Sequence, residues 1–353
     1  MLKQLQEALC RQEEFDALLI TSAANRRYAT GFPSSAGVCL ITRKNGWFFT
    51  DFRYIEAAQA KIRDFRIEQV KGGYAKMVNA ACEADGVSCI GYEESALICS
   101  EYAEWEKLLH CPMVPMKELI SDLRKVKSRW EADCCIEAQR IAERALEEVL
   151  NDIRPGVTER FLAARLTFLM LAYGGEKMSF DPIVVSGAKS SLPHGVPDDK
   201  PLEAGDFVVM DFGCTRGGYC SDMTRTVAVS HYTDEMAQVY QIVLDAQRAG
   251  IEAARAGVRG RFVDHAARKV IADAGYGEYF GHSFGHGIGL DIHELPLAAP
   301  SGMEILKSGN IISAEPGIYL PGKFGVRIED MLLITENGSE NLTKAPKQLT
   351  VCG

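Results

Sequence analysis

The first 120 residues alternate short apolar runs with segments in which apolar and polar residues follow a helical spacing. The apolar runs predict strands and the other segments predict helices, which together are typical of an α/β domain. The predicted strands are 15–21, 37–42, 46–50, 65–70 and 88–93, and the predicted helices lie near 2–12, 52–63, 74–84 and 101–110. This region contains no HxxxE, no HExxH and no glycine-rich phosphate loop, so we expect it to be a supporting domain.

Longer helical patterns follow, and their spacing sets the domain organisation. The predicted helices are 129–153, 158–173, 233–256 and 262–274. Arg154-Pro155-Gly156 ends the first of them, because proline cannot continue a helix. We place the domain boundary within 115–129, which gives an N-terminal domain of residues 1–125 and a C-terminal domain of residues 126–353.

The chain from residue 178 onward is rich in Gly, Pro and β-branched residues and contains an internal repeat. LEAGDFVVMDFG (202–213) and LKSGNIISAEPG (306–317) carry Leu, Gly, an acid and a second Gly at the same offsets. Each stretch leads into a turn and a second strand with a further acid, Asp222 or Glu329. The repeat predicts two similar halves that face each other across one site, although Gly before a strand is common enough for a chance match.

The repeated acids stand where a core is expected. Asp211 and Glu315 each follow an apolar strand, and a carboxylate buried there costs several kcal/mol unless it is paired or holds a cation. Asp222 and Glu329 come 11 and 14 residues later, a distance that suits the return strand of a hairpin. Four carboxylates at one place repel strongly, so the pattern predicts a site for divalent cations.

Two arginines are available to neutralise these acids, but they are too few. Arg225 and Arg327 lie close to Asp222 and Glu329 in the sequence. Two guanidinium groups leave half of the negative charge uncompensated, whereas divalent cations balance it better. Carboxylate oxygens with one imidazole suit Mn, Co or Fe and, less distinctively, Zn.

The stretch GHSFGHGIGLDIHELP (281–296) holds three of the seven histidines of the chain. Glycine and histidine are poor helix formers, so this density predicts a loop or strand that brings ligand-type side chains together. A metal or catalytic site is one interpretation, and a polar loop is the other.

Composition limits the classes of protein that need to be considered. Hydrophobic residues make up 47% of the 353 residues, which is enough for an ordinary globular core. A net charge of −9 without a Lys/Arg block disfavours nucleic-acid binding. No apolar run is long enough for a membrane span, and the charged start is unlike a signal peptide. Eleven scattered cysteines without a CxxC motif indicate buried thiols in a reducing cytoplasm.

The ordered set of motifs resembles a known family. SLPHGVP, VVMDFG, SDMTRT, GHSFGHGIGLDIHELP, SAEPGIY and GVRIED occur in the order found in Xaa-Pro aminopeptidases and Xaa-Pro dipeptidases (prolidases). NRRYATGFPSSAGVCLIT and FFTDFRYIEAA resemble the creatinase-type N-terminal domain of such enzymes. The resemblance covers the whole chain, and its C-terminal motifs are very specific as a set. It implies an α/β N-terminal domain and an α+β pita-bread catalytic domain with pseudo-twofold halves.

The resemblance also implies a dinuclear metal centre. Its ligands would be Asp211, Asp222, His286, Glu315 and Glu329. Asp222 and Glu329 would bridge two divalent ions, Asp211 would complete the shell of one ion, and His286 with Glu315 would complete the other. Mn or Co is the implied metal, and Zn or Fe is possible.

Further residues take roles by the same resemblance. Glu315 would accept the proton of the attacking water. His293 would hydrogen-bond the scissile carbonyl or the tetrahedral intermediate, and His194 would assist the leaving nitrogen and shape the proline pocket. His282 would form a wall of that pocket. Arg327 would lie near the far end of the substrate or pair with a ligand carboxylate.

The remaining candidates have simpler interpretations. Phe180 and Tyr319 could line the pocket, but we expect each to be ordinary core, and we expect Cys214 and Cys220 to be packing residues. The histidines read as structural or surface residues are His110, His231 and His265.

The sequence therefore predicts a cytoplasmic metallo-exopeptidase that removes the residue before proline from a dipeptide or a short peptide. It predicts no nucleic-acid or membrane partner, and a homodimer is what the resemblance implies. The alternatives are a methionine aminopeptidase-like enzyme, a creatinase-like hydrolase that needs no metal, and a catalytically silent binding protein on the same fold. The long N-terminal domain and AEPGIY disfavour the first, and five intact ligands disfavour the other two.

Overall fold

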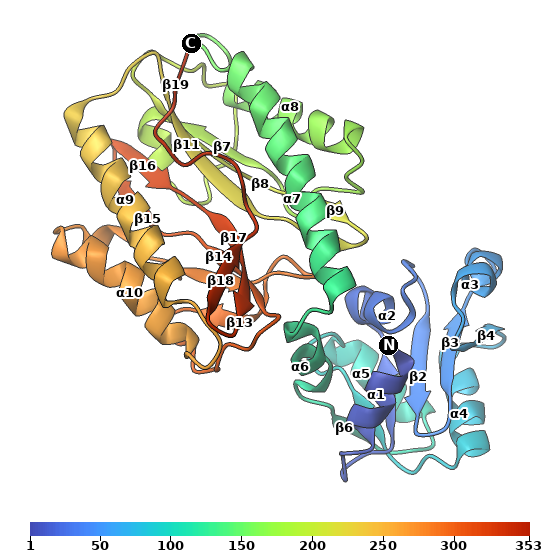
Figure 1. Cartoon of the computed structure of the whole chain (residues 1–353). Coiled ribbons are helices and arrows are strands. Elements are labelled where there is room, and N and C mark those ends of the chain that lie inside the picture. The colour runs from blue at the N-terminus through green and yellow to red at the C-terminus, as the bar shows by residue number, and fades with distance from the viewer. The chain divides into compact units, whose positions relative to one another are not determined.

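The computed structural model describes residues 1–353 and divides into two compact units. The first comprises Met1–Arg124 and the second Lys125–Gly353 (Figure 1).

The first unit is built on a mixed six-stranded sheet. Its order is β4-β3-β2-β1-β5-β6, with antiparallel β1–β2 and β2–β3 pairs and parallel β3–β4, β1–β5 and β5–β6 pairs. The strands are β1 Ala17–Ile20, β2 Val38–Thr42, β3 Gly46–Thr50, β4 Arg66–Gln69, β5 Ile90–Tyr92 and β6 Met113–Pro115. The helices are α1 Leu2–Leu9, α2 Ala23–Thr30, α3 Ile55–Lys61, α4 Tyr74–Asp85, α5 Cys99–Leu108 and α6 Leu119–Lys125, whose last residue lies across the unit boundary.

The predicted α/β layout of this unit is confirmed, and three short elements were missed. The missed elements are α2, β6 and α6. Signals for α2 were present, since Ser22 caps its first turn by accepting a hydrogen bond from Asn25 N. Gly31 ends the helix with φ of 69°, a left-handed conformation that glycine adopts readily.

The second unit repeats one order of elements. The first half is α7 Arg129–Val149, the 3-10 turn η1 Leu150–Asp152, α8 Glu159–Ala172, β7 Ile183–Ser186, the 3-10 turn η2 Gly187–Ser191, β8 Phe207–Phe212, β9 Thr215–Arg216, β10 Tyr219–Cys220 and β11 Met223–Val229. The second half is α9 Asp234–Ala253, α10 Gly260–Asp273, the 3-10 turn η3 Gly277–Tyr279, β12 Gly285–Gly287, β13 Glu294–Ala298, β14 Ile311–Ala314, β15 Gly317–Leu320, β16 Phe324–Arg327 and β17 Asp330–Thr335. Strands β18 Gly338–Asn341 and β19 Val351–Cys352 complete the unit.

Each half places a small hairpin between two paired strands. In the first half β8 pairs with β11 and encloses β9–β10, and in the second β14 pairs with β17 and encloses β15–β16. The sheets have the orders β19-β11-β8-β7 and β13-β12-β14-β17-β18. The four predicted helices, the two hairpins and the paired halves are therefore confirmed.

Helix pairs cover one face of each sheet (Figure 1). One core joins α7 and α8 to the first sheet, and a second joins α9 and α10 to the other sheet. Val208, Met210 and Phe212 of β8 point into the first core, and Ile312 and Ala314 of β14 point into the second. Since side chains alternate along a strand, residues 211 and 315 lie on the opposite faces, away from the helices.

Arg225 of β11 connects the two halves. Its buried guanidinium donates hydrogen bonds to Glu329 O at 2.6 Å, Asp330 Oδ1 at 2.9 Å, Ala345 O at 2.7 Å and Pro346 O at 2.9 Å. Arg225 is thus committed to the backbone around β17 and to Asp330, rather than to the carboxylates of Asp211, Asp222, Glu315 or Glu329.

Replacing Arg225 should weaken the second unit markedly. We expect Arg225→Met to lower the free energy of unfolding by about 3 kcal/mol or more, because each buried acceptor left without a donor costs about 1–3 kcal/mol. The variant leaves three carbonyls and Asp330 Oδ1 without the donor, while Lys347 and Asn341 still bond Asp330 Oδ2. Urea unfolding followed by circular dichroism measures this. Arg248→Met removes an exposed pair with Asp245 and serves as the control, for which we expect little change. Equal unfolding midpoints for the two variants would contradict this role of Arg225.

Candidate metal and catalytic site

Four carboxylates of the second unit lie at matching places on the two outer strand pairs, β8–β11 and β14–β17. Asp211 is on β8 opposite Thr224, and Asp222 immediately precedes β11. Glu315 immediately follows β14, and Glu329 immediately precedes β17, where Ala314 pairs with Asp330. Each outer strand pair therefore brings two acids together at one end, Asp211 with Asp222 and Glu315 with Glu329.

His286 of β12 joins this group. Its Nε2 atom lies 3.2 Å from Glu315 Oε1 and 3.7 Å from Asp222 Oδ2. Its Nδ1 atom donates to the carbonyl of Gly287 at 3.1 Å, which turns Nε2 toward the acids. Ligand atoms of Asp222, His286 and Glu329 all lie within 4.8 Å of one another, a spacing that could hold a metal ion.

Ser313 fixes the relation between His286 and Glu315. Its hydroxyl accepts a hydrogen bond from His286 N at 2.9 Å and donates one to Glu315 Oε1 at 2.9 Å. The neighbouring Gly285 has to be glycine, because a Cβ atom there would lie 2.0 Å from the carbonyl oxygen of Ser313. Gly285 thus permits the close strand contact that brings His286 to the acids.

A buried chain of polar groups supports Asp211. Arg327 Nη2 donates to Asp211 Oδ2 at 2.6 Å, and Arg327 Nη1 donates to the hydroxyl of Tyr319 at 2.8 Å. The same hydroxyl lies 2.8 Å from His282 Nε2. Burial raises the pKa of Tyr319 to about 12, against the opposing effect of Arg327. Tyr319 is buried, as expected for core, but its hydroxyl belongs to this network.

Three carboxylate oxygens in the group are buried and have no hydrogen-bond partner: Asp211 Oδ1, Asp222 Oδ1 and Glu329 Oε1. Burial, and then the neighbouring acids, raise the pKa of Asp222 and of Glu329 well above the usual range. A divalent cation among these oxygens would supply the missing partner and favour the charged carboxylates. The oxygen-rich donor set with one imidazole therefore fits a divalent metal ion.

Glu315 behaves differently from the other acids. Burial alone would raise the pKa of its carboxyl, but the hydrogen bond and charge of His286 outweigh burial and lower it to about 2. The pKa of His286 is raised in turn by Glu315, against the effect of burial. His286 thus favours the ionised form of Glu315, whereas burial and neighbouring acids favour the protonated forms of Asp222 and Glu329.

Two of the predicted histidines are exposed beside this group. The ring of His293 packs edge-on against that of His286, with centroids 4.4 Å apart and planes at 76°. His194 lies on the segment that follows η2. Burial, His286 and His194 all lower the pKa of His293, so the two exposed histidines are near enough for their charges to interact.

Sequence reasoning missed several residues around the site. Thr224 donates to Glu329 Oε2 at 2.7 Å and accepts from Arg327 Nε at 3.1 Å. The alternation of Asp222, Thr224 and Thr226 along β11 was a usable signal, because it marks the polar face of that strand. The buried ion pair between Lys127 and Glu294, next to His293, had no such signal.

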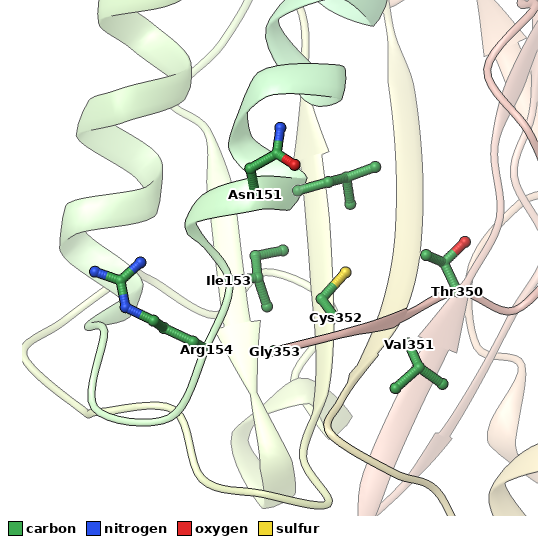
Figure 2. A pocket seen from close by; sticks show the side chains of 8 residues that line it. Asn151, Ile153, Arg154, Thr350, Val351, Cys352 and Gly353 are labelled. Carbon is green, nitrogen blue, oxygen red and sulfur yellow. The ribbon is translucent and has the colours of Figure 1, made fainter.

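The three remaining histidines are not part of this group, and the two cysteines are buried near Asp222 without a predicted role in it. His110, His231 and His265 are exposed, and Cys214 and Cys220 are buried thiols. A hollow of about 450 Å³, shown in Figure 2, lies between the end of the α7–η1 segment and β19. Its lining includes Asn151, Arg154 and Cys352 but none of the predicted site residues.

Two family models match the chain and together span most of it. Residues 133–336 match metallopeptidase family M24, and residues 1–126 match the creatinase/prolidase N-terminal domain. With the buried carboxylates and His286, these matches define a metallopeptidase with a creatinase-type N-terminal domain.

Individual relatives agree over nearly the full length. A Xaa-Pro dipeptidase of Pyrococcus horikoshii is 38% identical over 343 residues, covering 96% of this chain and 95% of the relative. A solved Xaa-Pro dipeptidase of Bacillus anthracis is 41% identical with a TM-score of 0.97, covering 99% of this chain and 100% of that chain. An X-Pro aminopeptidase of Thermotoga maritima is 37% identical with a TM-score of 0.91, covering 97% and 99%.

The chain therefore belongs to metallopeptidase family M24. The predicted family, fold and enzyme class, a metallo-exopeptidase, are confirmed. Membership of the family implies that a divalent metal ion is bound. Neither α7, α9 nor any other helix combines the length and the apolar composition that a membrane span requires.

Metal ions should stabilise the folded protein measurably. After removal of metal with EDTA, we expect added Mn²⁺ to raise the midpoint of thermal unfolding by several degrees, since ligand at 100 times its Kd contributes about 2.7 kcal/mol. Differential scanning fluorimetry measures the shift. We expect Glu329→Gln to reduce it strongly, whereas Glu340→Gln, an exposed acid of β18, should keep it. The same shift in both variants would contradict a metal site at Glu329.

Proposed function

We propose that this protein is a dinuclear-metal-dependent, proline-specific exopeptidase that hydrolyses the Xaa-Pro bond at the N-terminus of dipeptides or short peptides. The observation that carries the proposal is the buried group of four carboxylates and His286, beside the exposed His194 and His293. The names of the relatives, Xaa-Pro dipeptidases and an X-Pro aminopeptidase, support the substrate class.

In this proposal five side chains hold two divalent ions, with Mn or Co as the expected metal and Zn or Fe as alternatives. They are Asp211, Asp222, His286, Glu315 and Glu329. The three unpartnered carboxylate oxygens support the assignment, because a cation satisfies what no protein donor reaches. When bound, the two ions supply an activated water and polarise the scissile carbonyl.

The protein side chains then handle the protons. Glu315 accepts a proton from the attacking water at its carboxylate, a role supported by its place in the carboxylate group, 3.2 Å from His286 Nε2. His293 donates a hydrogen bond to the carbonyl oxygen as negative charge develops there. His194 provides a proton to the departing proline nitrogen.

Proline explains why such a proton donor is needed. The proline nitrogen carries no N–H and restricts the preceding residue, so general peptidases act poorly at this bond. The nitrogen also leaves poorly until it is protonated. The two exposed histidines beside the carboxylate group, His293 and His194, suit the stabilisation of the carbonyl oxygen and the protonation of the nitrogen.

We assign His282 and Arg327 to supporting roles. His282 forms a wall of the substrate pocket, held by its hydrogen bond to Tyr319. Of the two roles considered for Arg327, its bond to Asp211 favours pairing with a ligand carboxylate over contact with the far end of the substrate.

A cytoplasmic location and a homodimer complete the proposal. The eleven cysteines are unpaired thiols, which is in keeping with a reducing compartment. The homodimer rests on the family resemblance alone.

Peptide turnover tests the substrate class. The metal-free protein is restored with Mn²⁺ and given Ala-Pro, Ala-Pro-Ala or Ala-Ala, and the products are followed by mass spectrometry. We expect cleavage of the proline peptides and not of Ala-Ala. Ala-Pro alone indicates a dipeptidase, and cleavage of the tripeptide indicates an aminopeptidase. Equal cleavage of Ala-Ala removes the proline specificity, and no cleavage of any peptide by the metal-bound protein favours a binding protein.

Loss of the proton acceptor should stop turnover without unfolding the protein. We expect Glu315→Ala to lower kcat by at least about 100-fold, because a positioned acid or base typically contributes 10²- to 10⁴-fold. We expect His286→Ala to lower kcat at least as much, because it removes a proposed metal ligand. Circular dichroism confirms folding, and Glu336→Ala, a distant acid after β17, is the activity control. Near-normal kcat in either folded site variant would remove the proposed mechanism.

A further inference from the structure

The segment 187–198 carries His194 between β7 and β8. After the 3-10 turn η2 it has no regular secondary structure, and Leu192, His194 and Val196 are exposed. Such a segment is not rigid by itself, because it has no strand or helix hydrogen bonds of its own beyond that turn. Its position has to come from contacts with the rest of the second unit.

One buried carboxylate holds both ends of this segment. Glu159, the first residue of α8, has a fully buried side chain. Its Oε1 atom accepts hydrogen bonds from Ser186 N at 2.7 Å and Ser186 Oγ at 2.9 Å, at the start of the segment. Its Oε2 atom accepts from Lys189 Nζ at 2.7 Å and from Asp198 N at 3.4 Å, at the end of the segment. Lys189 Nζ also lies 2.6 Å from Asp198 Oδ2.

The middle of the segment is held by residues of the β15–β16 hairpin. Gly325 N donates to Ser190 Oγ at 2.8 Å, and Arg327 Nη1 donates to the carbonyl of Pro193 at 3.2 Å. His194 is therefore attached between the β15–β16 hairpin, which carries Arg327, and the carboxylate at the start of α8.

Glu159 does not cap its own helix. Thr158 performs that task by accepting a hydrogen bond from Phe161 N. All four donors to Glu159 come from residues 27 to 39 positions away. A buried carboxylate is retained only where such partners compensate it, so its contacts point to the segment and not to the helix.

We propose that Glu159 is a positioning residue that holds the 187–198 segment so that His194 faces the carboxylate group. This inference rests on the proposed function, in which His194 provides the proton to the leaving nitrogen. It predicts that Glu159 acts on turnover through His194 and not through the stability of α8.

A double-mutant cycle separates these two possibilities. In the full-length, Mn²⁺-loaded protein with Ala-Pro as substrate, we expect Glu159→Gln to lower kcat about tenfold, a part of what general-acid catalysis contributes. His194→Ala should lower kcat further, and the double variant should be no slower than His194→Ala alone, because a misplaced segment cannot matter once the imidazole is gone. If the double variant instead shows the product of the two single losses in kcat, the proposal is overturned.

Two further variants complete the design. Arg160→Gln, next in the chain, breaks an exposed pair with Asp199 and should leave kcat unchanged. Lys189→Met removes the cation from Glu159 and Asp198 and should reproduce the kcat loss if Glu159→Gln does not fold. Full activity of folded Glu159→Gln, or of Lys189→Met in its place, overturns the proposal.

Hydrogen exchange keeps the inference separate from the proposed function. We expect peptides from 187–198 to exchange faster in Glu159→Gln than in the parent protein, while peptides from β8 stay protected. If the parent protein cleaves no proline peptide, the proposed function fails. The exchange rates still show whether Glu159 holds the 187–198 segment in place. Unchanged exchange in 187–198 would show that Glu159 does not hold the segment.

Discussion

The structure of the second unit depends on placing four like-charged carboxylates in one buried group. Each would be costly alone, and together they repel, so the surrounding residues are arranged to compensate them. Arg327 pairs with Asp211, Thr224 donates to Glu329, and His286 with Ser313 holds Glu315. These protein donors leave three buried carboxylate oxygens without a hydrogen-bond partner, which is the chemical reason why a divalent cation fits there.

The two-half architecture follows from this constraint. A strand that is covered by helices on one face can present a carboxylate only on its other face. The strand pairs β8–β11 and β14–β17 each offer two such positions. These two strand pairs therefore supply four acids without placing any of them against a helix. Arg225 then fastens β11 to the start of β17 through backbone carbonyls, so the acids gain no further cation from it.

Much of the arrangement could be read from the sequence, for a physical reason. Asp211 and Glu315 interrupt apolar strands, and an acid in such a place signals either a paired charge or a cation. The long helices were predicted because their apolar spacing repeats over several turns. The contacts of Glu159 with Ser186 and Asp198, and of Lys127 with Glu294, left no such pattern. They join single residues across long stretches of chain, and only the folded backbone brings them together.

The contact between Thr224 and Glu329 spans 105 residues. Closing so large a loop has an entropic cost that must be met before the contact contributes, and contacts of this range are generally made late in folding. Each of the strand pairs β8–β11 and β14–β17 holds only two of the four acids. A chain in which only the first half has folded therefore lacks Glu315 and Glu329 at the site. The complete carboxylate group thus comes into being only with the finished tertiary structure of the second unit, so it cannot form on either half alone.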